Sequence, residues 1–288
     1  MNKLPTEKRA QIIRMLVEGN SFRSTSRMSD VSINTVVKLL IDTGKACQQF
    51  HYDTVIKLQS EKIQCDEIWS FVGCKEKEKG SHGEGDVWTW TALDTDTKMI
   101  ISWLVSERDA QTATVFMKDI RDRIVNSVQL TTDGHRPYLQ AVTTAFEYDV
   151  DYAMLIKMYG DNDGNTQTER KYRPAECTGT KKTRVMDDPN PKFVSTSYVE
   201  RCNLAMRMHS RRFTRLTNAF SKKIENHCYA IALHFVYYNF SKIHTSLSVT
   251  PAMQAGLTKK PMTIEDIANL AAIEAPKQRG GYKKKWSE

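Results

Sequence analysis

Between residues 61 and 158 the chain changes its hydrophobic periodicity several times, and the order of these changes limits the possible folds. Apolar residues recur at every second position in some stretches, as in strands, and at every third or fourth position in others, as in helices. We expect strands at 63–72, 87–93, 99–105, 128–132 and 151–158, and helices at 111–125 and 137–146. Three strands followed by helix, strand, helix and strand predict an α/β domain with helices covering a sheet.

That order is the one found in the RNase H-like fold of the retroviral integrase type. We therefore expect an RNase H-like catalytic domain over residues 61–255. A polar, turn-rich stretch at 159–197 is expected to be an insertion, either a β-hairpin or a loop. Helices are expected at 197–212 and 223–243, and residues 256–288 are expected to be a basic C-terminal extension.

The N-terminal 50 residues have a different pattern, typical of three short helices. They are predicted at Thr6–Val17, at Ser21–Met28, and from Ile33 to about Cys47, with Ser32 as the N-cap of the third. This outline predicts an all-α helix-turn-helix domain over residues 1–50, joined by a linker or bridging helix at 51–60. Its expected DNA contacts are Asn34, Thr35 and Lys38 in a major groove, with Arg23 and Arg27 near phosphates. The alternative is a small helical bundle with no role in DNA binding.

Three carboxylates lie where apolar or basic neighbours make an acid unexpected. Asp66 is in the middle of the first strand, Asp133 closes the fourth, and Glu200 opens a helix rich in arginine. An acid inside an apolar strand is disfavoured both by β-propensity and by the cost of burying charge. Asp66 and Asp133 would lie side by side if their strands are neighbours. We therefore predict that the three side chains hold two Mg²⁺ or Mn²⁺ ions for phosphoryl transfer.

Each of these residues also has an alternative interpretation. Asp133, followed by glycine, is typical of a turn at the end of a strand. Glu67 is a rival ligand next to Asp66. The sequence from Ser197 to Glu200 matches a capping box, in which the glutamate serves the helix N-terminus.

The positive charge of the chain is concentrated in two segments. The net charge is +8, while residues 201–223 carry +7 and residues 277–288 carry +4. A polyanion such as DNA is the partner that this distribution favours, although a solvated helix face would give the same pattern. The side chains expected to contact backbone phosphates are Arg207, Arg211, Arg212, Arg215, Lys222 and Lys223. Arg207 lies two helical turns after Glu200, on the same face of the helix.

Several classes of protein lack support in the sequence. No apolar run approaches the ~18–20 residues of a membrane span, and the N-terminus has no hydrophobic signal region. Six scattered cysteines suit a reducing cytoplasm better than a disulfide framework or a zinc ribbon. There is no phosphate-binding P-loop, no dinucleotide fingerprint, and no convincing active-site arrangement of a tyrosine recombinase.

Three blocks of sequence resemble the DDE transposases of the insertion-sequence-one family, which are encoded by bacterial mobile elements. They are Cys65–Gly73, Thr131–Leu139, and the segment from Tyr198 to Glu225; a fourth, Tyr238–Ala252, is similar to the C-terminal end of many DDE transposases. The resemblance spans roughly residues 60–255. Members often carry a cysteine zinc motif before the helix-turn-helix, and this chain has none.

The resemblance implies a function and a site. Asp66, Asp133 and Glu200 would be the catalytic triad that binds metal, and Arg207 would be the basic residue that follows the glutamate. The implied partners are double-stranded DNA, as terminal inverted repeats and as target, and further copies of the chain in a homo-oligomer on DNA. Two alternatives stay open: an RNase H-like nuclease or resolvase that only hydrolyses DNA, and a non-catalytic regulator derived from a transposase.

Overall fold

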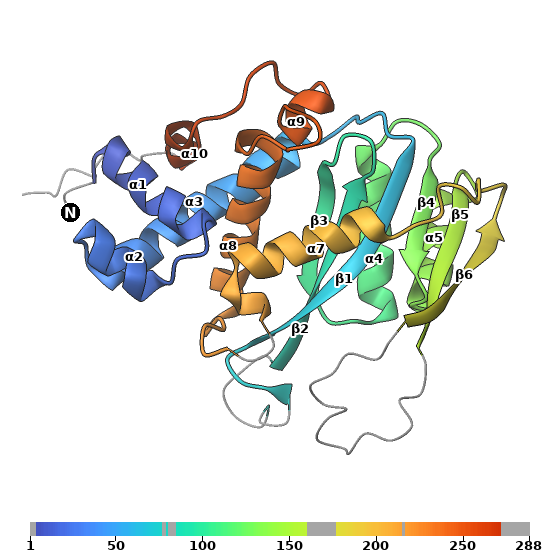
Figure 1. Cartoon of the computed structure of the whole chain (residues 1–288), viewed down its shortest axis with the longest axis horizontal. Coiled ribbons are helices and arrows are strands. Elements are labelled where there is room, and N and C mark those ends of the chain that lie inside the picture. Colours follow the sequence, from blue (N-terminus) through green and yellow to red (C-terminus); the bar gives the residue numbers. More distant parts are fainter. Residues whose placement is uncertain (1–3, 77–78, 80–84, 160–176, 215–216, 272–288) are drawn as a thin grey trace, which may run out of the picture.

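The computed structural model describes residues 4–76, 79, 85–159, 177–214 and 217–271, and its centre is a mixed six-stranded sheet (Figure 1). The strands are β1 Lys62–Val72, β2 Gly85–Asp94, β3 Ile100–Ser106, β4 Gln129–Asp133, β5 Asp151–Tyr159 and β6 Cys177–Met186. Their spatial order is β3-β2-β1-β4-β5-β6. β1 pairs antiparallel with β2 and parallel with β4. This mixed α/β sheet is consistent with the RNase H-like order expected from the sequence.

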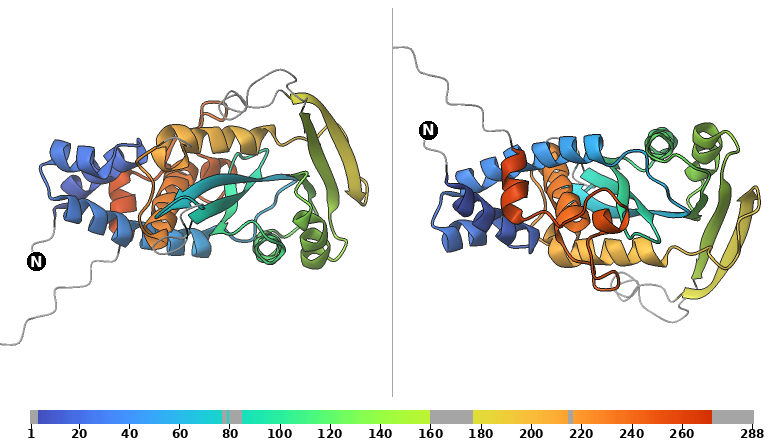
Figure 2. Two further views of the ribbon diagram at one scale, coloured as in Figure 1. Left: turned by 90° about the horizontal axis from the view of Figure 1, so that it is seen from below. Right: turned by 90° about the horizontal axis from the view of Figure 1, so that it is seen from above.

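Helices cover both faces of the sheet (Figure 2). α4 Ala110–Arg123 and α5 Pro137–Phe146 lie on one face, and α7 Ser197–His209 crosses the other. α8 Ile224–Val236 follows α7 after a short 3₁₀ turn, η2 Arg211–Phe213, and continues into a π-helical turn, η3 Tyr237–Ser241. The predicted helices at 111–125, 137–146, 197–212 and 223–243 are therefore all present, the last two interrupted or ended by these turns.

Alternation along β1 explains why both faces carry helices. Ile63 and Cys65 are buried within the main apolar core, which includes Phe116 of α4 and Tyr138 of α5. Ile68 belongs to a second cluster, formed with Val199 of α7 and residues of α8. Because successive side chains of a strand point to opposite faces, Lys62, Gln64, Asp66 and Ile68 share the α7 face.

The three predicted N-terminal helices are present, and the third is longer than expected. They are α1 Thr6–Val17, α2 Phe22–Ser29 and α3 Ile33–Thr54, with the Ser32 hydroxyl accepting a hydrogen bond from the Thr35 amide as predicted. α3 runs past Cys47 because its second half packs along α8, which approaches α3 very closely at Gly44. An added Cβ at Gly44 would lie 2.5 Å from the Tyr229 Cβ and carbonyl oxygen. α3 therefore belongs both to the N-terminal helices and to the α/β domain, where a separate linker was one expectation.

The C-terminal segment returns to the N-terminal helices. It contains α9 Pro251–Gln254 and α10 Ile264–Leu270. α10 packs on α1, where the Arg9 guanidinium donates to the Ala268 carbonyl at 2.9 Å and to Asn269 Oδ1 at 3.0 Å. The predicted extension at 256–288 thus contains, in its described part up to Ala271, a helix that packs on α1. Residues 272–288 lie outside the described residues.

The polar stretch predicted as an insertion adds the sixth strand. β6 pairs antiparallel with β5 along the edge of the sheet, and most of its side chains are exposed. Residues 160–176 of that stretch lie outside the described part. Among the described helices, none combines the length and apolar character needed to cross a membrane.

Candidate active site

Asp66 and Asp133 are brought together because β1 and β4 are parallel neighbours. Their register places Cys65 opposite Thr132, so the next residue of each strand is one of the two aspartates. Asp133 ends its strand, as expected for a turn: its Oδ1 accepts the His135 amide at 3.0 Å. Its Oδ2 remains directed into the site. Asp133 can therefore stabilise the turn with one oxygen and take part in the site with the other.

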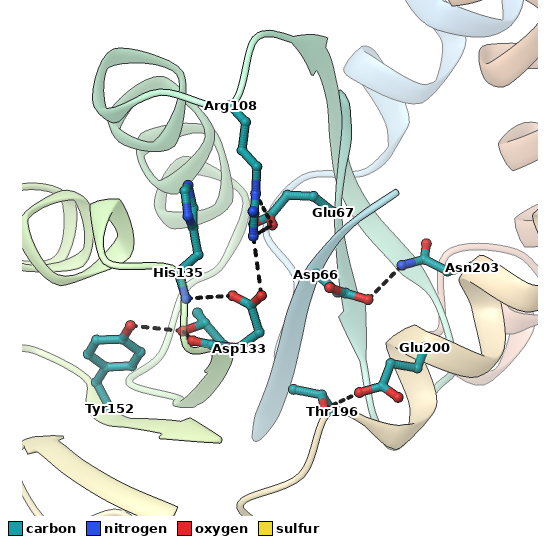
Figure 3. Close-up of polar contacts among 10 residues, drawn as sticks. Asp66, Glu67, Arg108, Asp133, His135, Tyr152, Thr196, Glu200 and Asn203 are labelled. Carbon is teal, nitrogen blue, oxygen red and sulfur yellow. Dashed lines mark hydrogen bonds and ion pairs between the residues drawn. The ribbon is translucent and has the colours of Figure 1, made fainter. Parts of the chain in front are cut away.

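Glu200 reaches the same region from the first turn of α7 (Figure 3). Gln64 of β1 fixes this end of the helix, because its Oε1 accepts the Tyr198 amide at 2.9 Å and the Val199 amide at 3.2 Å. The Glu200 carboxylate accepts the Thr196 hydroxyl and forms an ion pair of 2.6 Å with Lys157 of β5. It makes no capping contact, since the helix has no side-chain cap and the Ser197 amide donates to Ser195. The structure therefore does not support the alternative interpretation of Glu200 as a capping-box residue.

Asn203 connects α7 directly to Asp66. Its Nδ2 donates to Asp66 Oδ2 at 2.8 Å, while its Oδ1 is buried and has no hydrogen-bond partner in the described part of the chain. Asn203 lies three residues after Glu200, so both side chains project from one face of the helix. The sequence contains this spacing and could have indicated Asn203 as a member of the site, although it was not among the predicted residues.

A second acid, Glu67, joins the site from the other face of β1. One oxygen each of Asp66, Glu67 and Asp133 lie within 4.8 Å of one another, an arrangement that could hold a metal ion. The Glu67 side chain is only 1% exposed and forms an ion pair of 3.0 Å with Arg108. The acidic cluster thus contains the rival Glu67, whereas Glu200 lies on the far side of Asp66 (Figure 3). There Glu200 is paired with Lys157.

The electrostatics of the cluster favour a bound cation. Burial, followed by the charges of Asp133 and Glu200, raises the pKa of Asp66 to about 7. Burial and then the charge of Asp133 raise the pKa of Glu67 to about 8. Carboxylates that repel one another in a buried place are stabilised by a divalent ion with hard oxygen ligands. The buried Glu67 Oε1, which has no hydrogen-bond partner among the residues that the structure describes, fits such an ion as well.

A pH dependence follows from the raised pKa of Asp66. The neutral form is favoured in the metal-free fold, so this contribution to stability is complete below about pH 4 and is lost as the pH rises through 7. We expect the melting temperature of metal-free protein to fall between pH 5 and 8 more than that of Asp66→Asn. We also expect Mn²⁺ affinity to fall at least about tenfold per pH unit below 7, because a proton must leave. If the melting temperatures of the two proteins fell by the same amount between pH 5 and 8, the raised pKa of Asp66 would be contradicted.

The middle of the sequence matches a known domain. Residues 82–183, about a third of the chain, match a family model described as a DDE domain, of the IS240 type. This chain is similar to a DDE domain. The matched range contains Asp133 of the cluster, while Asp66 and Glu200 lie outside it. No curated protein matches the chain.

Solved transposase structures show only distant likeness. A Mos1 transposase paired-end complex with the left transposon end is 14% identical, with a TM-score of 0.24, covering 53% of this chain and 60% of that chain. A piggyBac transposase synaptic complex with hairpin DNA is 11% identical, with a TM-score of 0.43, covering 94% and 71%. The chain thus spans about three fifths of the Mos1 chain it matches.

The basic residues expected to bind phosphates divide into two groups. Arg207, Arg211, Lys222 and Lys223 are exposed. Arg212 differs: its guanidinium donates to the Ser221 hydroxyl at 2.6 Å and stacks 5.0 Å from the Phe22 ring of α2. It therefore links the N-terminal helices to the α/β domain, and the phosphate contact expected of it is replaced by contacts inside the protein. Arg215 lies outside the described residues.

This division predicts different effects for neighbouring arginines. Replacing Arg207 and Arg211 together by alanine should flatten the slope of log DNA affinity against log salt by about two, if each neutralises one phosphate as predicted. Arg212→Ala should leave that slope unchanged and reduce the free energy of unfolding by about 2 kcal/mol, because it removes a charged hydrogen-bond donor that holds Ser221. Salt titrations and denaturant curves on the full chain measure both. If Arg212→Ala flattened the slope and the double replacement of Arg207 and Arg211 did not, the roles of these arginines would be the reverse of those predicted.

The residues expected to face DNA on the N-terminal helices are mostly accessible. Arg23, Arg27, Asn34 and Lys38 are exposed, whereas Thr35 is half-buried and its hydroxyl lies 2.8 Å from that of Ser32. Lys38 also forms an ion pair of 2.8 Å with Asp42. Three residues separate α2 from α3, the spacing that predicted a helix-turn-helix.

Proposed function

We propose that this protein is a DDE-type DNA transposase of an insertion sequence, which binds the ends of its element and cleaves and joins DNA strands. The observation that carries the proposal is that β1 and β4 bring Asp66 and Asp133 together, with Glu200 of α7 near enough for its charge to raise the pKa of Asp66. The DDE-domain match over residues 82–183 supports it. In this proposal an RNase H-like domain supplies the chemistry and acts on double-stranded DNA within a homo-oligomer.

Asp66 and Asp133 would hold a divalent cation, with Glu200 or Glu67 completing a site for two Mg²⁺ or Mn²⁺ ions. Such ions activate a water or 3′-hydroxyl nucleophile and stabilise the departing oxygen in phosphoryl transfer. Asn203 orients Asp66 by holding one of its oxygens, and Gln64 sets the position of Glu200 by anchoring the start of α7. Lys157 holds the Glu200 carboxylate on the β5 side of the site, because its ammonium group lies 2.6 Å away.

A strand-transfer assay tests this function against the two alternatives. Full-length protein is incubated with Mg²⁺ and a linear duplex carrying the inverted repeats that flank its gene, together with supercoiled target DNA. We expect cleavage at the repeat and joined products in the target. Cleavage without joining would favour a nuclease or resolvase, and binding without cleavage would favour a regulator.

The N-terminal helices are proposed to recognise the element ends as a helix-turn-helix, with α3 in the major groove. Asn34→Ala or Lys38→Ala should weaken binding to the terminal repeat by about 1–3 kcal/mol if the residue contacts a base. The full chain is required, because α8 covers the apolar side of α3. Affinities for the repeat and for unrelated DNA are compared by fluorescence anisotropy, with Lys45→Ala on the same helix as the control. Equal losses on both DNAs would exclude base recognition by these residues.

A further inference from the structure

Arg108 places a positive charge inside the carboxylate cluster, from the segment between β3 and α4. Its Nη2 lies 3.0 Å from Glu67 Oε2 and 3.4 Å from Asp133 Oδ2, and its Nε donates to Glu67 Oε2 at 3.1 Å. Because Asp133 Oδ1 already accepts the His135 amide, Oδ2 is the oxygen left for a cation. The guanidinium therefore contacts the oxygen of Asp133 that a metal ion would use (Figure 3).

The surroundings of Arg108 hold the Nε side of its guanidinium and leave part of the side chain exposed. The Glu67 carboxylate is buried, and the Trp88 ring lies 4.8 Å from the guanidinium carbon. One third of the Arg108 side chain is exposed, at 33%. Its Nη1 donates no hydrogen bond to the part of the chain that the structure describes. A guanidinium fixed on one edge by a carboxylate, with the other edge open, is suited to bind phosphate oxygens.

We propose that Arg108 is a phosphate-binding residue of this site, and that in the DNA-free protein its contact with Asp133 competes with divalent cations. The proposal rests on the proposed function and adds to it a link between DNA and metal binding. When a DNA phosphate reaches the site, Nη1 and Nη2 turn to its oxygens while Nε stays on Glu67. Asp133 Oδ2 is then free to bind the metal, so DNA strengthens metal binding and metal strengthens DNA binding to the same degree.

Mn²⁺ binding to the full-length, DNA-free protein tests the competition. Arg108→Gln removes the positive charge and keeps an amide donor for Glu67. We expect it to bind Mn²⁺ about tenfold more tightly than wild type, measured by electron paramagnetic resonance, because a charge close to the ligand oxygen is gone. Arg121→Gln is the matched control: that side chain is 35% exposed and its ion pair with Asp149 is 3.3 Å long. Its Mn²⁺ affinity should equal that of wild type.

DNA binding tests the phosphate contact. With Ca²⁺ in place of Mg²⁺, Arg108→Gln should flatten the slope of log affinity against log salt by about one, and Arg121→Gln should leave it unchanged. An unchanged Mn²⁺ affinity or an unchanged salt slope in Arg108→Gln overturns the proposal.

If Arg108→Gln does not fold, the double variant Glu67→Gln with Arg108→Gln replaces it, since no buried charge is then left alone. The double variant is compared with Glu67→Gln. It should bind Mn²⁺ more tightly and show a flatter salt slope than that variant. Neither measurement requires cleavage. A wild type that fails to cleave DNA would therefore reject the proposed function without deciding the role of Arg108, and the reverse also holds.

Discussion

Asp66→Asn is expected to reduce DNA strand cleavage by at least about 10³-fold while leaving DNA affinity, measured without divalent metal, within about twofold. The substitution keeps the shape of the side chain and removes the charge needed to hold a divalent cation, which contributes several kcal/mol to phosphoryl transfer. Asp133→Asn should have the same effect, because the two residues are neighbours in the parallel pairing of β1 and β4. Initial cleavage rates with Mg²⁺ and equilibrium binding to the same duplex measure the two properties.

The control for charge alone is Asp122→Asn, an exposed aspartate on α4, whose cleavage rate should not change. Two further variants identify the third carboxylate. Glu200→Gln should match the loss seen with Asp66→Asn if the triad is Asp66, Asp133 and Glu200. If Glu200→Gln retains cleavage and Glu67→Gln loses it, the cluster of Asp66, Glu67 and Asp133 is the catalytic site.

Gly44→Ala is expected to destabilise the protein by about 3 kcal/mol, although alanine is the better helix former. In an exposed helix the same change would stabilise by about 1 kcal/mol. Here the new Cβ would meet Tyr229 of α8 at 2.5 Å, including its backbone oxygen, so the two helices must separate. Urea unfolding of the full chain measures the difference in free energy.

Lys45→Ala, at the next and exposed position of α3, is the control and should change the free energy of unfolding by less than about 0.5 kcal/mol. A stabilised Gly44→Ala would mean that α3 and α8 are not in close contact in solution.

The sequence predicted most elements because local pattern and tertiary environment agree. α5 has the predicted limits, Pro137–Phe146, since a proline starts it and the apolar positions face the sheet. The strand that carries Asp66 is likewise predicted because its local pattern agrees with its environment in the fold. That Asp66 and Asp133 are neighbours depends on strand order, which periodicity alone leaves undetermined and which the structure supplies.

The parts that were missed depend on contacts between distant segments. The stretch that contains β6 was expected to be either a β-hairpin or a loop, and its sequence did not decide between them. Polar residues such as Lys181 and Lys182 follow one another on an exposed edge, so there is no alternation of apolar and polar positions. Nothing near Arg108 in the sequence indicates that it meets Glu67 and Asp133. Arg212 lies within a run of basic residues, and only its contacts with Ser221 and Phe22 in the structure show that it faces inward.

The continuity of α3 has a consequence for the spacing of DNA sites. Its 22 residues form one rod of about 33 Å, close to one turn of B-DNA. One end of the rod carries Asn34. The other end lies against β3, where His51 contacts the Ile100 carbonyl at 3.2 Å. With α3 as the recognition helix, the distance and the rotation from the bases it reads to the bond that is cut are both fixed by this rod. About five extra base pairs between them would turn the scissile phosphate to the opposite side of the duplex, away from Asp66.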